Sequence, residues 1–210
     1  MKKIQEIEIN GQTWMSENLD VSHFQNGDEI MEVKSLYDWT IAHIGKIPAY
    51  CYYNYDSNYG PITGKLYNWH AVYDPRKLTP PGWDIPNDED WKLLNDYMKR
   101  VYTKKTLKNL YFWEDAYYTV FDKGNYSKTY TQPNSHQSLG FNAIPSGYCG
   151  SHGFFHRLGE ISHWYVNDRH KCYCKVKTIE NYSWKLIHDF GSKEHYYSVR
   201  CIKIPNIKLL

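Results

Sequence analysis

Residues 80–94, PPGWDIPNDEDWKLL, carry the clearest structural signal in the chain. Two prolines at the start exclude a helix upstream, and a third proline at position 86 fixes an extended entry, since proline lacks the backbone N–H. Asn87 can then cap a helix whose first turn holds three acidic residues, 88–90, where carboxylates interact favourably with the helix dipole. The stretch therefore predicts a rigid entry into a capped helix, and the acids need no catalytic role.

The helix that follows has one apolar stripe. Trp91, Leu94, Met98 and Val101 recur at steps of three, four and three residues, which predicts an amphipathic helix of about four turns. Trp83 before the helix and Trp91 within it are expected to reach the core.

Strands are predicted on both sides of this helix. Asn10-Gly11 is the dipeptide typical of a two-residue type I′ turn, so residues 3–15 are expected to form a hairpin. Short alternating runs near the C-terminus, FNAIP, HWYVN, CYCKVK, WKLIHDF and SVRCIKI, predict small antiparallel strands. Residues 17–58 are expected to be loop with short extended pieces, 64–74 a short helix, and 104–137 an insertion.

Composition limits the possible functions. The chain has 210 residues, enough for a single domain, and its formal net charge of +2 gives no reason to expect nucleic acid as a partner. No stretch is apolar enough to span a membrane. The 21 Tyr, 8 Trp and 7 Phe are abundant for a chain of this size, and such rings are common on recognition surfaces.

Six segments occur in an order that resembles a known family: EINGQTWMSENLD, GKLYNWHAVYD, PPGWDIPNDEDWKLL, LGFNAIPSGY, GFFHRLGEISHWY and YYSVRCIKI. On these motifs the chain resembles the Fibrobacter succinogenes major paralogous (FISUMP) domain from about Ile4 to Ile204. That family is distantly similar to formylglycine-generating enzymes and to the variable proteins of diversity-generating retroelements.

The resemblance implies an α+β domain with a C-type lectin-like fold. Such a domain would have two helices, paired first and last strands, and a small second antiparallel sheet under long loops. Asp84 stands where the family usually has histidine, and residues 163–167 replace a WSST-like run. Leu78-Thr79 stands where relatives often have a cysteine before the two prolines, which removes one candidate disulfide.

We expect a non-catalytic recognition module that binds a glycan, a peptide or a protein through an aromatic-rich loop face. Aromatic rings supply a large contact area at low entropic cost, while amide and hydroxyl groups adapt their hydrogen bonds. The candidate ligand-binding residues are Trp164, Tyr165, Asn167, Tyr173, Tyr182 and Trp184. A further alternative is a subunit of a surface or adhesin assembly.

A copper-dependent oxidase is the enzymatic alternative, because formylglycine-generating enzymes carry a comparable cysteine pair. Cys172 and Cys174 would lie on one face of a strand, and two thiolates can bind Cu(I). His170 would add a third metal donor. The competing interpretation is that both cysteines fill a small core.

Other cofactors and compartments have less support. Asn167-Asp168 offers too few oxygen ligands for a lectin-type calcium site, so calcium is not expected. The chain has five cysteines, an odd number that cannot all pair in disulfides, and this favours reduced thiols. The basic N-terminus lacks the apolar core of a signal peptide, and we expect a cytoplasmic protein or a processed exported form.

Overall fold

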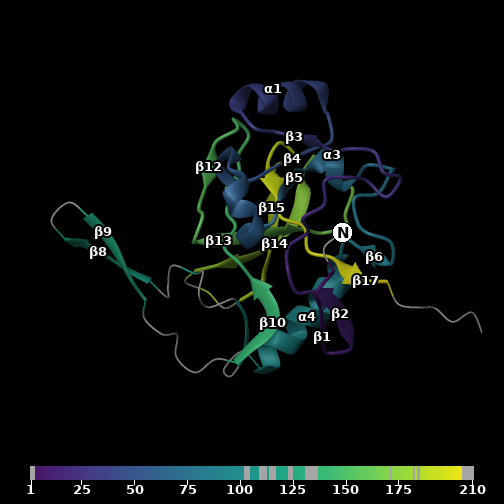
Figure 1. Cartoon of the computed structure of the whole chain (residues 1–210). Helices are drawn as coiled ribbons and strands as arrows, with labels where there is room; N and C mark the ends of the chain where they lie inside the picture. The colour runs from purple at the N-terminus through teal and green to yellow at the C-terminus, as the bar shows by residue number, and fades with distance from the viewer. Residues whose placement is uncertain are drawn as a thin grey trace, which may run out of the picture.

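The structure is a computed structural model. It describes residues 3–101, 105–108, 113, 117–122, 125–130, 137–170, 172–181, 183 and 185–204. Within these residues the chain combines four α-helices with several small sheets (Figure 1), which confirms the expected α+β class. The helices are α1 (Leu36–Gly45), α2 (Gly60–Thr63), α3 (Trp69–Val72) and α4 (Asp88–Val101).

Three sheets form the body of the domain. The first has the order β1 (Glu6–Ile9), β2 (Gln12–Met15), β17 (Ile202–Lys203), β6 (Trp83–Asp84). The second has the order β12 (Phe155–His156), β11 (Tyr148–Cys149), β16 (Tyr196–Tyr197), β5 (Leu66–Asn68), β4 (Ala49–Cys51), β3 (Met31–Glu32). The third contains β13 (Ile161–Tyr165), β14 (Cys174–Glu180) and β15 (Ile187–Gly191).

Two further strand pairs are built from the predicted insertion, 104–137, and the strand that follows it. β7 (Lys105–Lys108) pairs in parallel with β10 (Gln137–Ala143), and β8 (Tyr117–Asp122) pairs with β9 (Asn125–Tyr130) as an antiparallel hairpin. β10 contacts β1 of the first sheet.

The two ends of the domain meet in the first sheet. Asn10 and Gly11 both have positive φ, as the type I′ turn requires, and β1 pairs with β2 in the predicted hairpin. Ile202 of β17 pairs with Trp14 of β2 on one side and with Asp84 of β6 on the other. The last strand therefore pairs with the second strand of the N-terminal hairpin, β2, and not with the first strand, β1.

Helix α4 begins as the sequence predicts. Oδ1 of Asn87 accepts hydrogen bonds from the backbone N–H groups of Glu89 at 2.8 Å and Asp90 at 3.0 Å. Asp90 in return accepts the N–H of Asn87 at 2.9 Å, which gives a reciprocal cap. Trp91 is fully buried and stacks on Trp164 with ring centroids 6.1 Å apart, so α4 is fastened to the third sheet.

A buried arginine joins distant segments of this core. The guanidinium of Arg200 donates to Oδ1 of Asn18 at 2.7 Å and to the backbone carbonyls of Met15 and Phe141. It also lies over the ring of Phe141, 4.4 Å from the centroid. Five donors in a rigid fork suit this set of acceptors, which explains an arginine in the SVRC motif structurally.

Two expectations for the N-terminal half were wrong in part. The region expected to be loop contains α1, whose cap is Ser35: its Oγ accepts the N–H of Asp38 at 3.1 Å. The 64–74 segment is a strand, β5, followed by the single helical turn α3, where Asn68 provides the cap. No helix among the described residues is both long and apolar enough to cross a bilayer.

Candidate binding face

The alternation of side chains along β14 creates a polar face. Cys174, Val176 and Thr178 point into the core and are buried, while Lys175 and Lys177 lie on the opposite side of the strand.

The neighbouring strand completes this face. In the antiparallel pairing of β14 with β15, Lys175 stands opposite Phe190 and Lys177 opposite His188. We call Tyr173, Lys175, Lys177, His188 and Phe190 the β14–β15 face.

Aromatic rings form a continuous row along one side of this face. The rings of His170 and Tyr173 are stacked with centroids 3.7 Å apart. Tyr173 contacts Phe190 edge-on at 4.7 Å, and Phe190 contacts His188 at 5.4 Å. Phe190 is 60% exposed, so the row offers apolar ring surface directly to solvent.

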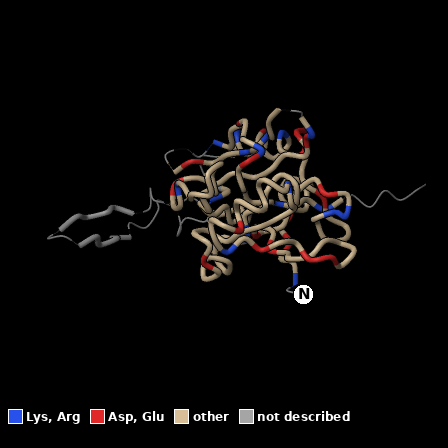
Figure 2. The backbone as a smooth tube through the Cα atoms, turned by 90° about the horizontal axis from the view of Figure 1, so that it is seen from above, with Lys and Arg blue, Asp and Glu red and all other residues tan. Residues whose placement is uncertain are grey.

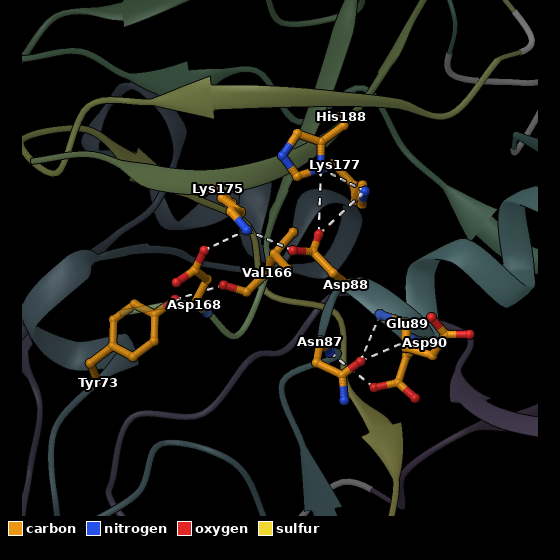
Figure 3. A network of polar contacts seen from close by, with 10 residues as sticks. All are labelled: Tyr73, Asn87, Asp88, Glu89, Asp90, Val166, Asp168, Lys175, Lys177 and His188. Carbon is orange, nitrogen blue, oxygen red and sulfur yellow. Dashed lines mark hydrogen bonds and ion pairs between the residues drawn. The ribbon is translucent and has the colours of Figure 1, made fainter. Parts of the chain in front are cut away.

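A network of polar contacts joins the start of α4 to β14 and β15 (Figure 3). Asp88, the first residue of α4, contacts Nζ of Lys175 at 2.7 Å, Nζ of Lys177 at 3.7 Å and Nδ1 of His188 at 3.4 Å. Lys175 also contacts Asp168 at 2.7 Å. The N-terminus of α4 is thereby joined to both strands of the face.

The network shifts the pKa values of its members. Burial alone would raise the pKa of Asp88, but the hydrogen bond from Lys175 and the charge of Lys177 lower it overall. Burial lowers the pKa of Lys177 despite the favourable charge of Asp88. Burial also lowers the pKa of His188, and the positive charge of Lys177 acts in the same direction.

A tyrosine holds the loop that supplies Asp168. The hydroxyl of Tyr73 donates to the carbonyl of Val166 at 2.6 Å and accepts the N–H of Asp168 at 3.1 Å (Figure 3). Because Tyr73 is buried, this loop has a fixed starting point beside β14. Lys and Arg residues lie among Asp and Glu residues around the body of the domain (Figure 2).

A groove of about 440 Å³ runs between α4 and this face. We call it the α4 groove. Its walls are lined by Asp88, Trp91, Lys92, Asn95, Asp96, Lys99, Lys177, Leu186 and His188. Lys177 and His188 belong to both the groove and the β14–β15 face, so the two surfaces are continuous.

The structure corrects the placement of two predicted ligand-binding residues. Trp164 and Tyr165 are fully buried, because both faces of β13 are covered in the core. Nε1 of Trp164 donates to Asn18 at 2.8 Å, and the ring packs against Trp91 and Phe141. These two side chains support the face from beneath and do not belong to it.

The other predicted residues lie elsewhere. Tyr173 belongs to the β14–β15 face, while Asn167 is exposed and lines a second cavity of about 420 Å³ together with Arg169 and Asp84. Tyr182 and Trp184 lie outside the described residues.

The two cysteines proposed to bind copper have different surroundings. Cys172 precedes β14 and is exposed, whereas Cys174 is the first residue of β14 and is buried. The expectation that both lie on one face of a strand was therefore wrong. Burial raises the pKa of the Cys174 thiol to about 12, which disfavours the thiolate needed for metal binding. The ring of His170 stacks on Tyr173, and its Nδ1 accepts the N–H of Cys172 at 3.2 Å.

The described residues include no group of three or more His, Cys, Asp or Glu side chains arranged to hold a metal ion.

Most residues of this face were not predicted from the sequence. Lys175, Lys177, His188 and Asp88 were not proposed as ligand-binding residues, although alternation in KVK already indicated two lysines on one side of a strand. The cross-strand partners Phe190 and His188 depend on the register of β14 with β15, which no local pattern specifies.

Comparison with known proteins finds one family model that matches most of the chain. The model of the Fibrobacter succinogenes major domain matches residues 7–203. Separate comparisons with curated proteins and with solved structures find no match. The match covers every element that builds the β14–β15 face and the α4 groove.

Proposed function

The chain belongs to the Fibrobacter succinogenes major domain family, and on that premise we propose that it is a recognition domain with a C-type lectin-like fold whose β14–β15 face binds a glycan, a peptide or a protein. The pairing of β17 with β2 and the small separate sheet β13–β15 support this fold.

One observation carries the proposal: exposed rings and partly desolvated charges lie side by side on one sheet face. Tyr173 and Phe190 provide apolar contact area, and both are held by ring neighbours. Lys175 and Lys177 alternate with them on the same face and are oriented by carboxylates. Aromatic rings such as that of Tyr173 are common among the residues that dominate binding energy in interfaces, and groups held in place before binding lose less conformational entropy.

The matched pair Phe190 and Phe154 tests the proposal. Both phenylalanines are 60% exposed, but Phe154 lies in the turn before β12, outside the face. Arrays of glycans and peptides should identify ligands that Phe190→Ala and Tyr173→Ala no longer bind, while Phe154→Ala binds as the wild type does. Ligands that all three variants bind equally would refute the assignment of this face.

The copper-dependent oxidase and the assembly subunit remain the alternative functions. The oxidase requires Cys172 and Cys174 to act on one ion, and their different burial gives it no support. A Cu(I) titration of the reduced protein against a competing chelator tests it directly, with Cys172→Ser and Cys174→Ser as the variants.

A further inference from the structure

The described residues that line the α4 groove carry more positive than negative charge. Lys92 and Lys99 both contact the single carboxylate of Asp96, each at 3.0 Å. Lys177 shares Asp88 with Lys175 and His188. Among the described residues that line the groove, the three ammonium groups of Lys92, Lys99 and Lys177 face the two carboxylates of Asp88 and Asp96, and Glu89 acts on Lys92 from outside the lining.

Lys177 has the longest carboxylate contact of these lysines, although its Nζ also donates to Nδ1 of His188 at 2.8 Å. Its side chain is only 11% exposed, and its distance to Asp88 is 3.7 Å, compared with 2.7 Å for Lys175. Burial lowers its pKa, so the ammonium group is held in a site that does not fully stabilise its charge. An anion in the groove would supply the missing stabilisation.

We propose that the α4 groove binds the carboxylate of a uronic acid residue within a glycan, with Lys177, Lys92 and Lys99 as its cationic wall. This inference rests on the proposed function, because it names the class of ligand that the β14–β15 face would take.

A glycan suits the surface because the groove and the ring row meet at His188. This residue lines the groove and contacts Phe190, whose exposed ring is next to the groove. A sugar chain could place one ring, with its carboxylate, in the groove and stack the next ring on Phe190. Asn95 and Asp96 on the groove wall offer an amide and a carboxylate for sugar hydroxyl groups.

The test uses the full chain and an array of oligosaccharides of glucuronic, galacturonic, mannuronic and guluronic acid, each beside its neutral methyl ester. We expect at least one acidic oligosaccharide to bind more tightly than its ester. Lys177→Gln and Lys99→Gln should each weaken that binding by roughly tenfold or more, as expected for loss of a charge-assisted hydrogen bond. Hexaglutamate is included to test the acidic-peptide alternative.

Lys34→Gln is the matched control. The side chains of Lys99 and Lys34 are both 68% exposed and each contacts a carboxylate, but Lys34 lies outside the groove. Because Lys177 is largely buried, thermal unfolding is measured to check that Lys177→Gln folds. If this variant does not fold, the exposed Lys99→Gln alone tests the inference.

Three results would overturn the inference: no acidic sugar that binds better than its ester, binding that Lys99→Gln and Lys177→Gln leave unchanged, or a preference for hexaglutamate. If neutral glycans or peptides bind and Phe190→Ala removes that binding, the inference fails while the proposed function stands. If no ligand depends on Phe190, the proposed function itself fails.

Discussion

Lys177 and His188 face each other across β14 and β15, and Nζ of the lysine lies 2.8 Å from Nδ1 of the histidine. An ammonium group can only donate, so Nδ1 of His188 accepts and carries no proton. His188 is therefore neutral in this arrangement, with its proton on Nε2.

The pKa of His188 should report on this contact. Burial and the charge of Lys177 both lower it from the ordinary value of 6.5. We expect Lys177→Met to raise the pKa of His188, because the variant removes the nearest positive charge. An NMR titration of the histidine ring signals measures this shift, with Lys34→Met as the control. An unchanged His188 pKa in Lys177→Met would show that the two groups do not interact in solution.

Asp88 should contribute more to stability than an equally exposed aspartate on the same helix. The side chains of Asp88 and Asp96 are 46% and 44% exposed, but only Asp88 combines the helix N-terminus with contacts to β14 and β15. We expect Asp88→Asn to lower the free energy of unfolding by about 1 kcal/mol in denaturant titrations. Asp96→Asn should cost less. Equal losses of unfolding free energy in Asp88→Asn and Asp96→Asn would mean that the position of Asp88 and its contacts with β14 and β15 add no stability.

Thiol labelling of the native protein should separate the two neighbouring cysteines. Cys172 is exposed and should react, while Cys174 is buried and its pKa is raised to about 12. Mass spectrometry of the native, reduced chain should show one label, on Cys172, and all five cysteines should react after denaturation. Rapid labelling of Cys174 in the native state would reopen the metal-binding hypothesis.

A buried histidine should make the fold sensitive to acid. Burial lowers the pKa of His163 to about 4, with a smaller effect in the same direction from Arg157. The unfolded chain binds a proton near pH 6.5, so the contribution of His163 is complete above that pH and is lost as the pH falls toward 4. Over this interval the loss amounts to about 3 kcal/mol for this one group.

His163→Gln tests this dependence. Glutamine can keep a hydrogen bond to Thr178, whose Oγ1 lies 2.8 Å from Nδ1 of His163, but does not titrate. The free energy of unfolding of the variant should therefore fall less than that of the wild type between pH 6.5 and 4. Parallel pH profiles would contradict the expected role of His163.

Local signals were sufficient to predict the elements that support the site. Asn87 and the apolar spacing from Trp91 predicted α4, and Asn10-Gly11 predicted the hairpin, because caps and tight turns depend on neighbouring residues. Helix α1 was missed even though Ser35 and Asp38 form a cap at its start. Its exposed Leu36, Tyr37, Ile41 and Ile44 obscured the usual apolar periodicity.

The composition of the binding face could be predicted only in part. Of the predicted aromatic residues, Tyr173 lies beside β14, but Trp164 and Tyr165 could not be recognised as buried, because burial on both faces of β13 depends on Trp91 and Tyr67 from other elements. The meeting of Asp88 with Lys175 joins residues 87 positions apart. Such contacts are set by tertiary packing and leave no local signature.

The most direct test of the central claim is an amide chemical-shift map of the labelled protein with the ligand that binds best on the arrays. We predict that the largest shifts occur at residues 173–177 and 187–191 and at the start of α4 around Asp88. Shifts concentrated instead on α1 and around Phe154, with β14 and β15 unaffected, would contradict the assignment of the binding face.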